Sequence, residues 1–182
     1  MYDINFFPDG EQVEIYLAGG CFWGVETYIS RILGVYETEV GYANGNTKNP
    51  TYEEVCNFDT KHAECVKVTY SPDFISLKEL LEEFFKIIDP IAINRQGPDI
   101  GTQYRTGIYY TDIRDKQIAE MFIKEKQLNY SKKIAVEVMP LTYFYPAETY
   151  HQKYLEKNPN GYCHVDLLSL IHISEPTRLR CI

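Results

Sequence analysis

One cysteine lies in a segment that combines a thiol with glycines and two aromatic side chains, GGCFWG at residues 19–24. An alternating segment stops at the two glycines and a helical periodicity starts at Cys21, so the thiol lies at a strand-to-helix turn. The free N–H groups and the positive dipole end of the helix favour a thiolate there, and the glycines let another molecule approach the backbone closely. We predict that Cys21 is a nucleophile; the alternative is a buried cysteine packed as a small hydrophobe.

The two aromatic residues after Cys21 point in different directions from the start of a helix. At least one of Phe22 and Trp23 could therefore line the mouth of a pocket, where an aromatic wall suits a methyl or thioether group. Composition alone leaves a core position equally open for both side chains.

Glu64 is a candidate acid because it begins a strand whose other residues on the same face are apolar. Glu64, Val66 and Val68 share that face in the alternation of residues 64–70. A carboxyl group among apolar side chains has a raised pKa and can donate a proton at neutral pH. The alternative is a solvated glutamate at the end of the strand.

Two pairs of residues resemble metal ligands without completing a site. His62 and Glu64 form the H-x-E pattern of zinc deaminases, but the P-C-x-x-C segment of those enzymes is absent. Glu148 and His151 have the spacing of half a di-iron site, which occurs here in one copy. We therefore predict no metal, and a structural hydrogen bond for Glu148 and His151.

Cys163 ends a flexible segment, NPNGYC at residues 158–163, that follows the last predicted helix. A mobile thiol suits a resolving cysteine, which attacks a sulfenic acid to form a disulfide; the alternative is an incidental exposed cysteine. The five cysteines form no C-x-x-C pair. Cys56 and Cys65 lie beside presumed core residues and are interpreted as structural.

The elements that must position these residues follow the order β-α-β-β-α-β, with a further helix, strand and helix after it. Hydrophobic periodicity, glycine breaks and capping signals predict them. The expected elements are strands at 13–18, 35–42, 64–70, 105–110 and 135–139 and helices at 21–33, 76–88, 112–128 and 146–156. The predicted fold class is α+β: a ferredoxin-like two-layer sandwich with a C-terminal helix–strand–helix extension. Two turn-rich segments, 43–62 and 93–103, are interpreted as functional loops.

Length and charge limit the class of protein. The chain has 182 residues, of which 45% are hydrophobic, and a net charge of −8. It is long enough for one domain with its own core, and its acidity argues against nucleic acid or an anionic membrane surface as the main partner. The N-terminal residues lack the pattern of a signal peptide, and no apolar run reaches the length of a spanning helix. We expect a cytoplasmic monomer.

Six motifs resemble, in the same order, those of the peptide methionine sulfoxide reductase A family, and the resemblance covers residues 13–166. They are GGCFWGVE at 19–26, VGYA at 40–43, YEEVC at 52–56, HAE at 62–64, GPDIGTQYR at 97–105 and FYPAE-x-YHQKY at 144–154. The family reduces the S epimer of methionine sulfoxide, free or in proteins, and thereby repairs oxidative damage. It needs no metal or organic cofactor.

The resemblance implies a role for each matching residue. Cys21 is similar to the family's nucleophile, which attacks the sulfoxide sulfur, and Glu64 to the acid that protonates the sulfoxide oxygen. Tyr52 and Tyr104 resemble the hydroxyl donors that hold this oxygen, and Asp99 resembles their polar partner. By the same resemblance, the cage for the substrate methyl group consists of Phe22 and Trp23.

Cys163 occupies the Gly-Tyr-Cys position at which many family members keep their resolving cysteine. The resemblance therefore implies a Cys21–Cys163 disulfide, which thioredoxin, or dithiothreitol in an assay, reduces. Residues 1–167 are expected to form a single reductase A domain. The segment 168–182, which includes Cys181, has no family counterpart and resembles a translated sequencing adapter, so it is interpreted as a read-through. The segment before it also resembles members in which a reductase B domain follows.

Two other functions remain open on the residues alone. A thiol peroxidase shares a reactive cysteine and a sulfenic acid intermediate. A non-enzymatic, tyrosine-rich binding module would use Cys21 only as a structural residue, and the 16 tyrosines of the chain are compatible with it.

Overall fold

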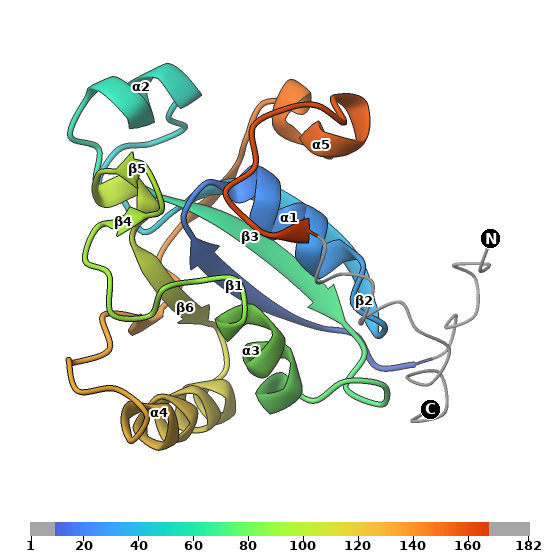
Figure 1. Cartoon of the computed structure of the whole chain (residues 1–182). Helices are drawn as coiled ribbons and strands as arrows, with labels where there is room; N and C mark the ends of the chain where they lie inside the picture. Colours follow the sequence, from blue (N-terminus) through green and yellow to red (C-terminus); the bar gives the residue numbers. More distant parts are fainter. Residues whose placement is uncertain (1–9, 168–182) are drawn as a thin grey trace.

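Six strands form one sheet in the order β7-β6-β1-β3-β2-β8, and helices pack against it (Figure 1). The computed structural model describes residues 10–167. The sheet contains β1 (Val13–Gly19), β2 (Val35–Ala43), β3 (Ala63–Tyr70), β6 (Thr106–Tyr110), β7 (Glu137–Pro140) and β8 (Phe144–Pro146). The α-helices are α1 (Phe22–Ser30), α2 (Tyr52–Asn57), α3 (Leu77–Phe85), α4 (Ile113–Gln127) and α5 (Tyr154–Lys157).

Within the central group β6-β1-β3-β2 all neighbouring strands are antiparallel, whereas the outer β7 runs parallel to β6. Leu17 of β1 pairs with Val66 of β3, and Tyr42 of β2 pairs with Glu64 of β3. The prediction of a mixed fold of helices and strands is confirmed. The order strand, helix, strand, strand, helix, strand from β1 to β6 also occurs in the structure, with additional short elements in the two turn-rich segments.

Both faces of the sheet are covered by other parts of the chain. Successive apolar residues of β1 point to opposite faces and pack into two different clusters. Ile15 and Leu17 belong to the main core, which also contains buried side chains of α1, α3 and α4. Tyr16 and Ala18 face the opposite side and join a smaller cluster, against which Phe144 packs. The helices thus cover one face, and the segment that leads into β8 covers part of the other.

The predicted helix over residues 146–156 is wrong. This region contains the end of β8, a single 3-10 turn (Thr149–His151) and the short α5. Lys153 has a φ of 54°, which a continuous helix does not allow. Gln152 instead bonds to the edge of β2: its Oε1 accepts from the Val40 N–H at 2.9 Å, and its Nε2 donates to the Val40 carbonyl at 2.8 Å. Pairing with the sheet therefore outweighs the helical periodicity.

The two turn-rich segments contain structure that the sequence prediction missed. Residues 43–62 include α2, which begins with a capping box in which Thr51 and Glu54 bond to each other's backbone N–H groups. Residues 93–103 include a two-stranded hairpin of β4 (Arg95–Gln96) and β5 (Asp99–Ile100) and lead into a 3-10 turn (Thr102–Tyr104). The elements within both segments are only two to six residues long, too short for a clear hydrophobic periodicity.

Within residues 10–167, no helix is long and apolar enough to cross a membrane. The predicted read-through segment 168–182, with Cys181, lies outside the residues that the structure describes.

Candidate active site

Cys21 lies at the N-cap of α1, as the strand-to-helix turn predicts, and is 7% exposed. Its pKa is nevertheless raised, mainly by burial and next by the charge of Glu64, while a bond with the backbone N–H of Trp23 lowers it. The helix start thus acts in the predicted direction but is outweighed, because burial penalises the charged form. The raised pKa favours the protonated thiol, in contrast to the thiolate that the helix start favours by itself.

The glycines before Cys21 serve the protein's own packing. Gly20 has a φ of +87°, and a Cβ there would lie 2.6 Å from the Cβ of Gln96. Gln96 in turn is buried and holds Asp89 through two backbone hydrogen bonds of 2.8 Å. At Gly20, the space that a side chain would occupy is thus filled by Gln96 of the chain itself.

Glu64 is buried at the second position of β3, with 1% exposure. Its Oε1 accepts the backbone N–H of Phe22 at 3.2 Å, which places the carboxyl group beside the residue that follows Cys21. Burial raises the pKa of Glu64 to about 8, the Phe22 N–H lowers it, and the charge of Asp99 raises it. The predicted rise in the pKa is confirmed, and the group is a neutral acid at pH 7.

The second oxygen of Glu64 is where the proton can reside. Oε1 accepts from the Phe22 N–H, and Oε2 has no hydrogen-bond partner among the described residues. A protonated carboxyl has one O–H donor. The arrangement therefore leaves a buried O–H available beside Cys21.

Two tyrosines from different loops lie close enough to Glu64 for its charge to raise their pKa values. Tyr52 begins α2, and Tyr104 ends the 3-10 turn before β6. The pKa of each phenol is raised, first by burial and second by the charge of Glu64. Both hydroxyls therefore stay protonated and can donate hydrogen bonds. The structure thus brings the two predicted tyrosines to the same carboxyl group.

Asp99 lies on β5 and accepts a hydrogen bond of 2.9 Å from the Tyr162 hydroxyl. Its charge also raises the pKa of Cys21, Glu64 and Tyr104. The predicted polar partner is therefore part of the same electrostatic cluster, although its bonded partner, Tyr162, was not foreseen.

Phe22 and Trp23 have different environments. Phe22 is 1% exposed, and its ring packs against Tyr42 with centroids 5.8 Å apart. Trp23 is half-buried, stacks on Tyr154 and donates its indole N–H to Nδ1 of His151 at 2.9 Å. Of the two alternatives that the sequence left open, Phe22 fits the core, and Trp23 retains an exposed part.

Cys163 lies against the first turn of α1. Its sulfur donates to the Val165 carbonyl at 3.3 Å, and a Cβ built on Gly24 would lie 2.9 Å from that sulfur. Gly24 is three residues after Cys21, so the two thiols lie beside one helical turn. Both are free cysteines in this structure.

Other residues flagged by the sequence have separate roles. His62 is buried, and its ring bonds the Gly45 N–H and the Thr47 carbonyl. Within residues 10–167, no three His, Cys, Asp or Glu side chains are grouped to hold a metal ion.

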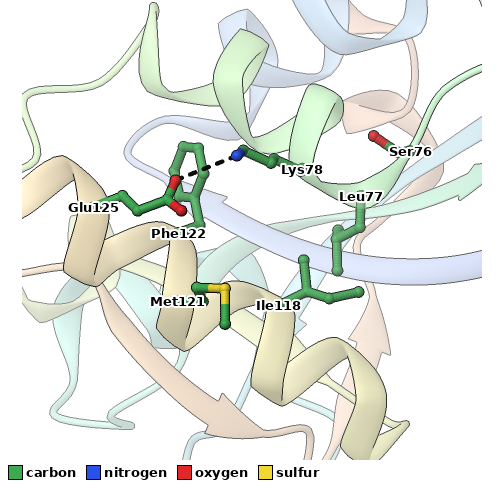
Figure 2. A pocket seen from close by; sticks show the side chains of 7 residues that line it. All are labelled: Ser76, Leu77, Lys78, Ile118, Met121, Phe122 and Glu125. Atoms are coloured by element: carbon green, nitrogen blue, oxygen red, sulfur yellow. Dashed lines mark ion pairs between the residues drawn. The ribbon is translucent and has the colours of Figure 1, made fainter.

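An apolar hollow between α3 and α4, bridged by the Lys78–Glu125 ion pair at 3.3 Å, shares no lining residue with this site (Figure 2).

Comparisons with known proteins point to one family. The sequence model of the family "peptide methionine sulfoxide reductase" matches residues 13–177. Peptide methionine sulfoxide reductase MsrA of Clostridium perfringens strain 13 is 60% identical over 154 residues, which are 85% of this chain and 98% of that protein.

Two solved structures are also similar. The reduced form of Mxr1 from Saccharomyces cerevisiae has a TM-score of 0.80 and 42% identity, over 84% of this chain and 89% of that chain. The complex of Mxr1 with Trx2 gives a TM-score of 0.57 and 29% identity, over 79% of this chain and 85% of that chain.

A buried thiol at a helix start, beside a buried acid that keeps its proton, defines a site for cysteine-dependent redox chemistry. The matched residues include every part of this site, and the chain belongs to the peptide methionine sulfoxide reductase A family. It is accordingly an oxidoreductase, a methionine sulfoxide reductase.

The proton on Glu64 predicts how stability depends on pH. Between the ordinary value near 4.5 and the folded value of about 8, the native state holds a proton that the unfolded chain releases. The contribution of Glu64 is therefore fully present below pH 4.5 and is lost as pH rises through about 8. Urea unfolding across this range should show a stability decline in the wild type that is smaller in Glu64→Gln. A matched change at the exposed Glu53, Glu53→Gln, should retain the wild-type decline. Equal slopes in the wild type and Glu64→Gln would place the proton elsewhere.

Proposed function

We propose that this chain reduces the S epimer of methionine sulfoxide, free or in proteins, to methionine, with Cys21 as nucleophile and Glu64 as acid. One observation carries the proposal: Glu64 is a buried neutral acid whose Oε1 is bonded to the Phe22 N–H and whose Oε2 is available beside Cys21. A sulfoxide is a poor electrophile until its oxygen is protonated or strongly hydrogen-bonded, so the thiol needs this acid.

In the first step the sulfur of Cys21 attacks the sulfoxide sulfur while Glu64 donates a proton to the sulfoxide oxygen. The net change is thiol plus sulfoxide to sulfenic acid plus thioether: the S–O bond of the substrate breaks, and Cys21 takes up the oxygen. Because the pKa of Cys21 is raised, the thiol still carries its proton when the step begins. This proton must leave the sulfur during the step and pass to Glu64, which has given its own proton to the sulfoxide oxygen. An ionised Glu64 is a base that can accept this proton, although its charge also raises the pKa of Cys21.

The remaining residues orient the substrate. Tyr52 and Tyr104 carry protonated phenols that can donate to the sulfoxide oxygen, and Asp99 adds negative charge that keeps the nearby acids protonated. Trp23 presents the half-buried aromatic surface for the methyl group, and Phe22 supports it from the core. These roles also follow the family resemblance of the motifs.

In the second step Cys163 attacks the sulfenic acid of Cys21, which gives a disulfide and water. The packing of the Cys163 sulfur on Gly24, one turn from Cys21, supports this pairing. We propose a thioredoxin as the reductant that restores the two thiols, by analogy with the Mxr1–Trx2 complex. An external thiol is then the sole co-reactant, with no bound cofactor, and the cytoplasm is the proposed location.

We also propose that β6-β1-β3-β2, with α1 and α3 on one face, represents a ferredoxin-like core within a single domain. The antiparallel strand order and the shared apolar cluster of the two helices support this grouping.

Replacement of Cys21 tests the assignment directly. Cys21→Ser should abolish reduction of methionine S-sulfoxide with dithiothreitol as reductant, because the hydroxyl is a far weaker nucleophile. The assay should include the R epimer and hydrogen peroxide as alternative substrates. Turnover of peroxide without sulfoxide would indicate a thiol peroxidase, and no turnover of any of them would leave a binding module. Appreciable sulfoxide reduction by Cys21→Ser would refute the proposal.

Replacement of Glu64 separates the acid from the nucleophile. Glu64→Gln should slow the reductase step by about a hundredfold or more, because an amide cannot supply the proton. In single-turnover measurements the wild-type rate should fall as pH rises through about 8, where Glu64 ionises. The variant should lack this fall. A variant rate equal to that of the wild type would remove Glu64 as the acid.

Replacement of Cys163 tests the second step. Cys163→Ser should still release one methionine per enzyme, because the first step does not use Cys163, but should lose turnover driven by thioredoxin. Mass spectrometry of the oxidised wild type should locate a Cys21–Cys163 linkage. Full thioredoxin-driven turnover in the variant would assign the resolving role to Cys56, to Cys181 or to an external thiol.

A further inference from the structure

His151 is buried in the middle of the aromatic side chains beside the active site, with 1% exposure. Its ring lies 4.4 Å from that of Tyr52, 4.0 Å from that of Tyr150 and 5.3 Å from that of Phe22, measured between ring centroids. It is the last residue of the 3-10 turn after β8, in the region where the sequence predicted a helix. A histidine among so many rings is costly to bury unless it makes a specific bond.

That bond runs to the half-buried Trp23. The indole N–H of Trp23 donates to Nδ1 of His151 at 2.9 Å. Because an indole N–H can only donate, Nδ1 must be the acceptor and the ring proton must be on Nε2. A doubly protonated imidazole has no acceptor, so the contact requires the neutral ring. Burial lowers the pKa of His151, which is consistent with that requirement.

Two contacts together fix the indole in space. The Tyr154 ring stacks on Trp23 with centroids 3.8 Å apart and planes inclined by 12°, and this stacking covers one face of the indole. Stacking limits the tilt of the ring, whereas the bond to His151 limits its rotation within the plane. One face of Trp23 is thereby held in a constant orientation.

The chain segment that carries His151 is itself anchored on both sides of this residue. Upstream, Glu148 accepts the Tyr52 N–H at 3.0 Å and the Tyr42 hydroxyl at 2.9 Å. Downstream, the Lys153 N–H donates to the buried Glu26 at 2.7 Å. The position of His151 is therefore set by contacts that do not depend on Trp23.

We propose that His151 is a positioning residue for Trp23, and that its neutral Nδ1 holds the indole plane in the orientation that receives the methyl group of the substrate. The inference rests on the proposed function, in which Trp23 contacts that group. His151 acts through Trp23 and takes no part in proton transfer. Glu148 and His151 thus each hold one aromatic residue of the site in place: Glu148 bonds to the backbone of Tyr52, and His151 bonds to the indole of Trp23.

The test exploits the fact that Trp23 is the only tryptophan of the chain, so intrinsic fluorescence reports on this side chain alone. Three variants separate the acceptor from the volume of the ring. His151→Asn keeps an acceptor near the Nδ1 position, His151→Gln moves the amide one bond further away, and His151→Leu removes it. His62→Asn changes an equally buried histidine that bonds the Gly45 and Thr47 backbone and serves as the control.

Time-resolved fluorescence anisotropy without substrate should show a fast local rotation of Trp23 in His151→Leu and His151→Gln. The wild type, His151→Asn and His62→Asn should lack it. In steady-state assays, His151→Leu and His151→Gln should raise KM for methionine S-sulfoxide by about five- to tenfold, the usual effect of one lost hydrogen bond. Their kcat should change less than the KM, because the reacting groups are untouched.

Several results would overturn the inference. These are an unchanged anisotropy in both His151→Leu and His151→Gln, an added rotation without a change in KM, or a fall in kcat with KM unchanged. His151→Asn behaving like His151→Leu would also overturn it, because the acceptor would then be irrelevant. If His151→Leu does not fold, the comparison of His151→Asn with His151→Gln decides. A wild type that lacks sulfoxide reductase activity would instead refute the proposed function, whatever the anisotropy shows.

Discussion

The hydrogen bond from the Phe22 N–H to Glu64 is the interaction on which the site depends. It joins the first residue of α1 to β3 and so fixes the distance between a thiol at the helix start and an acid inside the sheet. The same burial that keeps Glu64 protonated also keeps Cys21 protonated. A site of this kind rests as two neutral acids and becomes charged only when a substrate arrives to accept a proton.

The C-terminal part of the chain contributes more to this arrangement than its irregular backbone suggests. Between β8 and residue 167 it supplies the ring stacked on Trp23, the acceptor for its indole N–H and the second thiol beside α1. These contacts span more than a hundred residues of sequence. The nucleophile and its surroundings are therefore assembled from both ends of the described chain, with β3 between them.

The sequence was informative where a pattern is local. The turn at Cys21, the alternation around Glu64 and the capping box of α3 each depend on a few neighbouring residues, and the structure contains all three. The ionisation of Cys21 was not predictable in this way, because it depends on burial by distant elements. The prediction of a helix after β8 was wrong for a similar reason. Gln152 and Lys153 bond to β2 and α1, and such contacts leave no periodic signal in the sequence.

The bonds of Gln152 to Val40 also bear on how the molecule avoids self-association. An outer strand offers unpaired backbone groups to any other extended chain, which is a route to aggregation. Here β8 pairs with Gly41–Ala43 of β2, and the carboxamide of Gln152 occupies both backbone groups of Val40. The part of β2 before Val40 carries Glu37 and Glu39, whose charges discourage another strand from adding there. The Gln152 side chain and the Ala147 N–H, which donates to the same Val40 carbonyl at 2.9 Å, thus extend the protected length of this sheet edge by one residue beyond the β8 pairing.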